Sequence, residues 1–149
     1  MGDMTTNSDE YAPSTSDWVR EQAEKVTEAG TTDAVDIIGL KVVLMTMRGA
    51  KSGKIRKVPV MRVEKDGVYA AVASQGGAPE HPTWYHNFVA DPHVDLQDGP
   101  EPREYVARLA EGDERAEWWE RCVAQYAPYA EYQEKTDREI PVFLLEPVA

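Results

Sequence analysis

Short runs in which apolar and polar residues alternate recur along most of this chain, and such runs are typical of β-strands. They lie at residues 41–47, 57–64, 68–74, 93–97, 103–110 and 141–146. Asp66-Gly67 predicts a tight hairpin that pairs the second run with the third. The turn sequence that begins at Asp98 predicts the same for the fourth and fifth runs.

A helical period begins near the N-terminus, where Ser14 or Ser16 could cap a helix that ends near Glu28. Its apolar face carries Trp18, Val19, Gln22, Ala23 and Val26. Docking of this helix on a membrane surface is one alternative. Its acidic side chains are unlike the basic face of a membrane-surface helix, so we expect it to pack on the sheet.

Two more helical segments lie in the second half of the chain. Residues 82–90 form a short one that stops at Asp91-Pro92. Asp113 predicts the start of another, which Pro128 interrupts before residues 129–136 resume the helix. The core-facing side of this helix carries Trp118, Trp119, Cys122, Val123 and Tyr126.

Six short strands with hairpin links and peripheral helices predict a mainly β fold, namely a small antiparallel barrel. We expect residues 14–149 to form a single domain, because the chain length fits one core. Residues 1–13 are polar and predicted to be a disordered tail.

The composition excludes several classes of protein. The 149 residues include 27 Asp or Glu against 16 Lys or Arg, a net charge of −11, which argues against nucleic-acid binding. Cys122 is the single cysteine and the three histidines lack the spacing of zinc ligands, so we expect no metal. No apolar run reaches the roughly 18 residues that span a bilayer, and no secretory signal pattern is present. These features predict a soluble, cytoplasmic protein.

A basic segment interrupts this acidic sequence. Residues 41–65 carry eight Lys or Arg and a single acid, Glu64. Six of the cations have no acid among them: Arg48, Lys51, Lys54, Arg56, Lys57 and Arg62. Either neighbouring acidic surface neutralises them, or the segment binds a small polyanion. The glycines within it favour the second explanation, because they let backbone N–H groups approach a phosphate.

Two further segments could line the same site. Ser74-Gln75-Gly76-Gly77 follows a predicted strand, and its glycines would let a planar ring lie against the backbone. Three tyrosines spaced by three residues offer flat apolar rings with hydroxyl tips: Tyr126, Tyr129 and Tyr132. No Walker A loop and no Rossmann glycine motif is present, so these common nucleotide sites are excluded.

Together these blocks resemble the deazaflavin (F420)-dependent nitroreductase and quinone reductase family. Residues 49–60 read GAKSGKIRKVPV, similar to the family signature G-[RA]-K-[ST]-G-x-x-R-x-x-P-[LV]. Residues 72–87 read VASQGGAPEHPTWYHN, similar to its V-A-S-K-G-G-A-P-x-x-P-x-W-Y-x-N block. Residues 126–133 and 138–142 resemble its tyrosine-rich and R-x-I-P-V elements. Three blocks in the same order make the resemblance specific from about residue 40 to the C-terminus.

The resemblance implies a split β-barrel of the flavin-mononucleotide-binding type that holds coenzyme F420, a deazaflavin with an anionic tail. Lys51, Ser52, Gly53 and Arg56 would bind the phosphate and tail. Met45, Thr46, Val58 and Pro59 would flank the cofactor. Ser74, Gln75, Gly76 and Gly77 would contact the deazaflavin, with Trp84 and Asn87 nearby. Tyr126, Tyr129 and Tyr132 would face the ring and shape the substrate pocket.

The implied activity is hydride transfer from reduced F420 to a flat, electron-poor acceptor such as menaquinone or, promiscuously, a nitroaromatic. We expect the hydroxyl of Tyr129 or Tyr132 to hydrogen-bond the acceptor oxygen as charge builds there. Ala50 and Gln75 depart from the arginine and lysine that many family members carry. An FMN-dependent oxidoreductase and a non-catalytic F420-binding or storage protein remain alternatives, as do a monomer and a homodimer.

Overall fold

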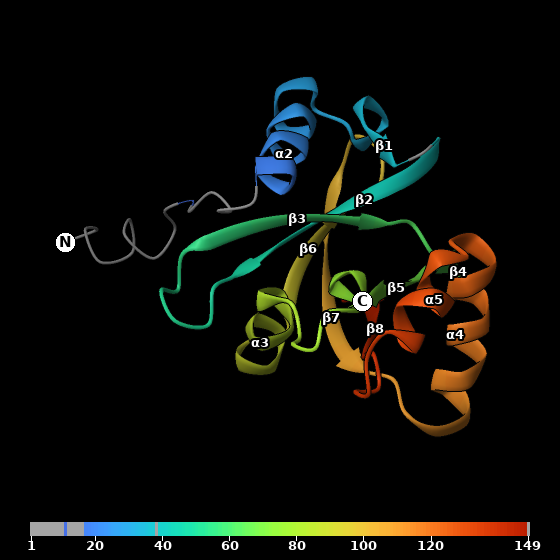
Figure 1. The fold of residues 1–149 in the computed structure, drawn as a ribbon. Coiled ribbons are helices and arrows are strands. Elements are labelled where there is room, and N and C mark those ends of the chain that lie inside the picture. Colours follow the sequence, from blue (N-terminus) through green and yellow to red (C-terminus); the bar gives the residue numbers. More distant parts are fainter. Residues whose placement is uncertain (1–10, 12–16, 38, 149) are drawn as a thin grey trace.

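Figure 1 shows a largely antiparallel sheet that curves into a half-barrel, with a few helices around it. The computed structural model describes Tyr11, residues 17–37 and residues 39–148. The strands are β1 (Asp36–Ile37), β2 (Leu40–Arg48), β3 (Ile55–Met61), β4 (Glu64–Lys65), β5 (Val68–Val72), β6 (His93–Gln97), β7 (Pro102–Leu109) and β8 (Val142–Pro147). The predicted tail lies outside the described residues apart from Tyr11, and the two candidate capping serines lie outside them as well.

The strand order is β1-β2-β6-β7-β8-β5-β4, and β3 pairs with β2 beside this path. The β6–β7 pairing confirms the hairpin predicted for residues 93–97 and 103–110. Strand β2 pairs with three other strands, namely β1, β3 and β6. Residues from all three neighbours therefore have fixed positions relative to β2.

The pairing predicted for residues 57–64 is wrong for most of its length. Strand β3 pairs with β2, and only Glu64 and Lys65 pair with β5 across Asp66-Gly67. The chain changes neighbours over two residues: the N–H of Arg62 donates to Lys41 of β2, whereas the carbonyl of Val63 accepts from Ala70 of β5. Apolar and polar residues alternate through this change, so the period alone could not locate it.

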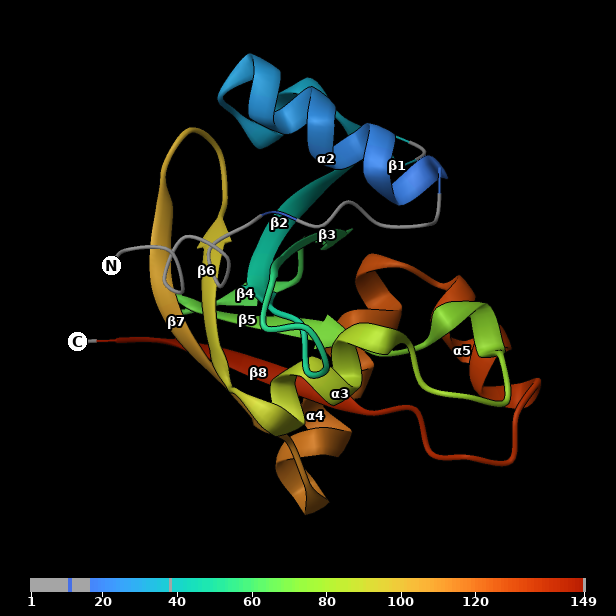
Figure 2. The same cartoon turned by 90° about the vertical axis from the view of Figure 1, so that its left-hand side faces the viewer.

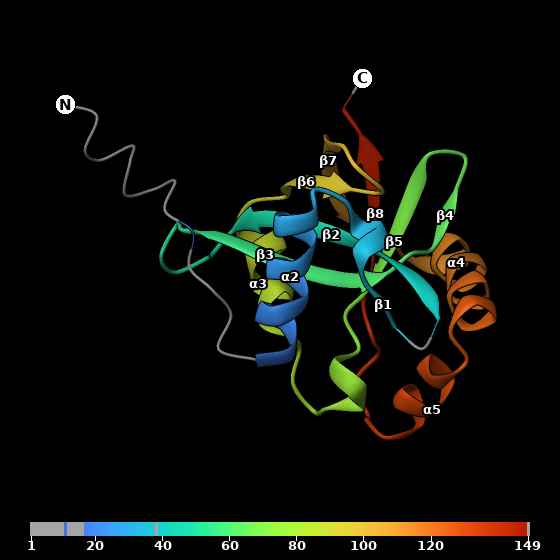
Figure 3. The ribbon, with the colours of Figure 1, turned by 90° about the horizontal axis from the view of Figure 1, so that it is seen from above.

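The helices are α2 (Asp17–Ala29), η1 (Thr32–Ala34), η2 (Gln75–Gly77), α3 (Thr83–Ala90), α4 (Gly112–Gln125) and α5 (Pro128–Glu134). Figures 2 and 3 show α2 lying over the β2–β3 side of the sheet, with α4 and α5 at the opposite end of the molecule. Glu111 precedes the first turn of α4, and Pro128 occupies the first turn of α5, where a proline is tolerated. No helix among the described residues is long and apolar enough to cross a membrane.

Apolar side chains on the two faces of β2 belong to two separate hydrophobic cores. Val43 and Met45 point into the half-barrel interior, whereas Val42 and Leu44 pack under α2 with Val26. Each fully buried side chain of this size contributes about 1.5 to 3 kcal/mol. Packing of α2 on the sheet is therefore confirmed. A further core lies beneath α4 and α5 and includes Trp118, Cys122, Tyr129 and Ile140.

Candidate functional site

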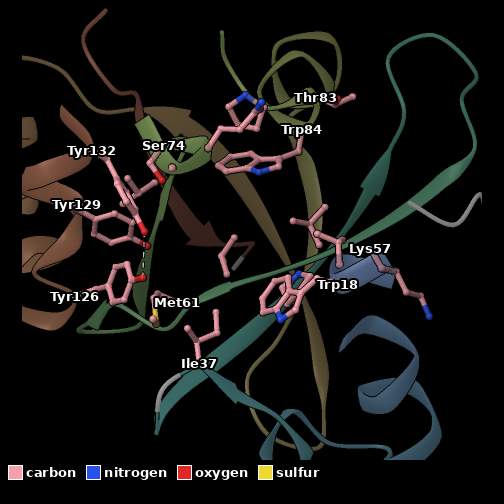
Figure 4. A pocket seen from close by; sticks show the side chains of 18 of the residues that line it. Trp18, Ile37, Lys57, Met61, Ser74, Thr83, Trp84, Tyr126, Tyr129 and Tyr132 are labelled. Atoms are coloured by element: carbon pink, nitrogen blue, oxygen red, sulfur yellow. Dashed lines mark hydrogen bonds between the residues drawn. The ribbon is translucent and has the colours of Figure 1, made fainter. Parts of the chain in front are cut away.

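A cavity of about 690 Å³ opens between β3, the η2 turn, α3 and the tyrosines of α4 and α5. Figure 4 shows Tyr126, Tyr129 and Tyr132 on one side and Trp18 and Trp84 on the other. The predicted site residues that line it are Arg56, Val58, Pro59, Ser74, Gln75, Gly76, Trp84, Asn87, Tyr126, Tyr129 and Tyr132. The structure thus brings together eleven positions from four separate stretches of the chain.

The tyrosines form a contacting cluster at the junction of α4 and α5. The helix breaks at Tyr126, whose ring centroid lies 5.0 Å from that of Tyr129 and 6.3 Å from that of Tyr132. The hydroxyls of Tyr126 and Tyr132 share a hydrogen bond of 3.3 Å. The Pro128 break therefore converts a sequence spacing of three into convergence on one cavity.

The Tyr129 hydroxyl differs from the other two. The residue is 6% exposed, and its hydroxyl has no hydrogen-bond partner within the described part of the chain. Burial raises the pKa of Tyr129 above that of an ordinary tyrosine. The hydrogen bond with Tyr126, together with burial, raises the pKa of Tyr132 to about 12. Both side chains are consequently neutral donors near pH 7.

The η2 turn presents its backbone to the cavity. Gln75, Gly76 and Gly77 all have positive φ angles, of 46°, 64° and 84°. The N–H groups of Gln75 and Gly76 begin this turn and have no acceptor within it. Gly77 does not line the cavity; it is buried behind the turn against α5.

Asn87 connects α3 to the basic turn between β2 and β3. Its Oδ1 accepts a hydrogen bond of 2.8 Å from the N–H of Ala50. Within the turn, Ser52 Oγ accepts from the N–H of Lys54, and Gly53 has a φ of 71°, which favours glycine. Lys51, Ser52 and Gly53 lie outside the cavity lining, and this hydrogen bond joins their turn to its Asn87 wall.

Positive charge continues from that turn into the cavity wall. Lys51 is exposed and makes no ion pair with any described carboxylate. Lys57 donates to the hydroxyl of Thr27 at 3.1 Å and lies over the ring of Tyr11. Neutralisation by acidic surface therefore does not account for these two cations.

Two predicted contacts lie away from the cavity. Met45 is completely buried inside the half-barrel and does not line the cavity. Thr46 lines a separate hollow with Asp91, His93 and Asp95. The alternation of β2 side chains places these neighbours on opposite faces of the strand.

The structure adds cavity residues that sequence reasoning missed. They are Trp18, Val19, Ile37, Lys57, Val60, Met61, Val72, Pro82 and Thr83. Lys57, Val60 and Met61 lie in β3 beside the predicted contacts Val58 and Pro59, so their position in the sequence could have indicated that they line the cavity. Nothing in the helical period of α2 indicated that Trp18, 46% exposed, borders a cavity. Within the described ranges, no group of three or more His, Cys, Asp or Glu could hold a metal ion.

Comparison with known proteins decides the family. A family model described as F420H(2)-dependent quinone reductase matches residues 18–147. The chain belongs to this family. It is an F420-dependent oxidoreductase, and coenzyme F420 is its cofactor.

Relatives with this family name come from Mycobacterium tuberculosis. One, from strain H37Rv, is 38% identical over 104 residues, covering 70% of this chain and 87% of its own. Another, from strain CDC 1551, is 33% identical over 105 residues, covering 68% and 70% respectively.

Solved structures agree with this family. One titled as an F420-H2 dependent reductase is 57% identical, with a TM-score of 0.67 over 70% of this chain and 93% of its own. Another, described as a domain-swapped dimer, is 56% identical, with a TM-score of 0.70 over 89% of this chain and all of its own. A Listeria innocua structure titled as a pyridoxamine 5'-phosphate oxidase is 11% identical and has a TM-score of 0.51 over 72% of this chain and 84% of its own. It supports the split-barrel fold alone.

The residues of the cavity fit this cofactor. Val58, Pro59 and Trp84 are apolar walls suited to a flat ring, and the η2 turn offers backbone donors beside them. Residues 48–63 contain no acid, which suits a ligand with a phosphate and a carboxylate tail. Within the segment, Arg62 is instead paired with Asp98 and Glu64 of the protein itself.

Proposed function

We propose that this protein transfers a hydride from reduced F420 to a quinone that lies against the tyrosine cluster. The observation that carries the proposal is the Tyr129 hydroxyl, which is neutral, has no hydrogen-bond partner in the described residues and lies on a side chain that lines the cavity. A hydroxyl at the cavity wall can donate its proton to a ligand without breaking a hydrogen bond inside the protein. A quinone oxygen can accept this hydrogen bond.

The cofactor would lie along β3. In this arrangement Arg56 and Lys51 bind the phosphate and tail, and Val58 and Pro59 flank the ring. The N–H groups of Gln75 and Gly76 donate to polar atoms at the ring edge. These roles follow from the charge at one end of the cavity and the apolar walls at the other.

The bound cofactor supplies the hydride, and the protein positions the acceptor. Tyr129 donates a hydrogen bond to the acceptor oxygen, where negative charge grows. Its raised pKa keeps the proton on the hydroxyl throughout the physiological range. The sequence left Tyr129 and Tyr132 as alternatives. We assign the role to Tyr129 because the Tyr132 hydroxyl already bonds to Tyr126.

Acceptors other than quinones would have to be flat and carry an oxygen near Tyr129. Nitroaromatics meet both conditions, so we propose them as promiscuous substrates. We also infer a homodimer, supported by the relative at 56% identity that is described as a domain-swapped dimer. Light scattering on the purified protein would measure its mass in solution.

The test has two stages. Quenching of the four tryptophans is followed during titration with oxidised F420 and, in parallel, with FMN. We expect saturation with F420 at micromolar concentrations and a much weaker response to FMN. Oxidation of F420H2 is then followed with and without a soluble menaquinone analogue. Oxidation that is no faster with the quinone would contradict the proposal and favour a storage protein.

The same assay can place the acceptor. Vesicles that carry menaquinone, compared with vesicles that lack it, test access to a membrane quinone. Sedimentation of the protein with either vesicle would support the expected peripheral contact with the membrane. A protein that stays in the supernatant but reduces the soluble analogue would point to a soluble acceptor.

A further inference from the structure

Arg138 lies behind the η2 turn and binds both ends of it. Its guanidinium donates to the carbonyls of Ala73, Ser74 and Ala78 at 3.1, 2.8 and 2.9 Å. Arg138 makes no ion pair with a described carboxylate, so these backbone oxygens are its main partners. One planar side chain thereby fixes three peptide groups on either side of Gln75-Gly76-Gly77.

These bonds determine where the turn points its donors. The carbonyl of Ser74 and the N–H of Gln75 belong to one planar trans peptide and point in opposite directions. Because the carbonyl is bound to Arg138, the N–H of Gln75 points away from the guanidinium. Gln75 and Gly76 line the cavity, whereas Arg138 does not. The arginine therefore orients a cofactor donor that it does not touch.

The turn needs such support. Gln75 has a φ of 46°, a left-handed conformation that side chains other than glycine rarely adopt. Strained backbone persists only where its surroundings hold it. His81 completes the support: its Nδ1 accepts from Arg138 Nη1 at 3.0 Å, because a guanidinium can only donate.

The segment that contains Arg138 is also hydrogen-bonded to α5. Gln133 of α5 donates to the carbonyl of Arg138 at 2.7 Å and accepts from the N–H of Ile140 at 2.9 Å. On the other side of the turn, Gly77 packs directly against the backbone of Tyr132. The segment that carries Arg138 thus links the η2 turn and α5 into one unit.

We propose that Arg138 is a positioning residue, which holds the backbone donors of the η2 turn toward F420 and sets their distance from the tyrosines. The inference rests on the proposed placement of F420 beside this turn. The nearby Arg115 provides a matched comparison. It also donates to the backbone of this segment, at the Ile140 carbonyl, and lies over the ring of Trp119, yet it makes no contact with the turn.

The experiment compares Arg138→Ala, Arg138→Lys and Arg115→Ala with the wild type. We expect Arg138→Ala to raise the Kd for F420 roughly tenfold or more, because donors that must first be ordered bind more weakly. Arg138→Lys should recover only part of this loss, since a single ammonium cannot reach three carbonyls. Millimolar guanidinium ion added to Arg138→Ala should restore binding toward the wild type. Arg115→Ala should leave the Kd unchanged.

A second measurement needs no cofactor. The N–H groups of Gly77 and Ala78 are hydrogen-bonded within the turn, and their hydrogen exchange should be about tenfold faster or more in Arg138→Ala. If Arg138→Ala does not fold, Arg138→Lys carries both measurements. Wild-type affinity in a folded Arg138 variant, or an equal loss in Arg115→Ala, would overturn the inference. Failure of the wild type to bind F420 would instead contradict the proposed function.

Discussion

A Cβ on Gly77 would lie 2.7 Å from the backbone oxygen of Tyr132, so the η2 turn and α5 meet backbone to backbone. No real Cβ tolerates this distance from a peptide oxygen. The contact places the η2 turn directly beside the helix that carries Tyr129 and Tyr132. A glycine is required there for its small size as well as for its φ of 84°.

Gly77→Ala should therefore destabilise the protein by roughly 2 to 4 kcal/mol, from the collision and the left-handed backbone together. Gly99→Ala is the control, since Gly99 has a φ of 86° but nothing within 4 Å of the added methyl. It should cost only about 1 to 2 kcal/mol. Urea unfolding measures both. Equal losses would show that α5 moves aside at little cost.

Tyr129→Phe should lower kcat for quinone reduction roughly ten- to a hundredfold, because the developing oxygen charge loses its donor. Stability and the Kd for F420 should hardly change, since the hydroxyl has no partner among the described residues. Tyr105→Phe removes a hydroxyl from another buried ring, outside the cavity, and should leave kcat unchanged. Steady-state kinetics with a menaquinone analogue decide the matter. A parallel loss of kcat and cofactor affinity would refute the assigned role.

The Tyr126–Tyr132 hydrogen bond predicts a change of stability at alkaline pH. The pKa of Tyr132 is raised to about 12, so its contribution is complete below the ordinary tyrosine value near 10 and disappears as pH rises through 12. Tyr126→Phe removes the hydrogen bond that is the main cause of this shift. The difference in unfolding free energy between the two proteins should close between about pH 10 and 12. A constant difference would mean that the bond does not perturb the pKa.

Cys122 should be inert in the native protein. It is completely buried on α4, and burial raises the pKa of its thiol to about 12, so almost no thiolate forms at pH 8. A thiol-specific chromogenic reagent should react only after urea unfolds the chain. Rapid reaction of the native protein would reveal opening of the core beneath α4.

Asn87→Ala should raise the Kd for F420 about three- to tenfold, because the N–H of Ala50 loses its acceptor and the basic turn is no longer tied to α3. Gln97→Ala is the control, because it also removes a hydrogen bond between a side-chain amide and the backbone. The Gln97 amide donates to the carbonyl of Gly99, and neither residue lines the cavity. Fluorescence titration of both variants measures the effect. Equal affinities would show that the turn keeps its position without Asn87.

The sequence predicted most strands and all the longer helices, because their periods and turn residues are local properties. The partner of β3 was not predictable in this way. The change from β2 to β5 at Arg62 and Val63 depends on the three-dimensional path of the chain, and the alternation of side chains continues through it. Asp66-Gly67 specified the turn correctly but not the length of the pairing.

In the candidate site, too, the sequence predicted what local motifs specify but not what depends on the folded chain. The motif at residues 74–77 and the three tyrosines led to residues that line one cavity, except for Gly77, since those motifs carry specific backbone and ring chemistry. The resemblance implied that Thr46, near the end of the strand before the basic motif, flanks the cofactor, but the alternation of side chains in β2 turns it to another face. Arg138 belonged to a recognised motif, but only the folded backbone reveals which three carbonyls it binds.

Pro59 in the middle of β3 has a consequence for how the protein behaves at high concentration. Apart from the bridge between Tyr11 and Ile55, β3 pairs only with β2 in the described chain, which leaves one edge of the strand beside the cavity. A proline has no N–H, so a ladder built on that edge is interrupted at its centre. Another polypeptide cannot easily extend the sheet there. Edge-to-edge aggregation is thereby discouraged at the strand that small molecules must approach.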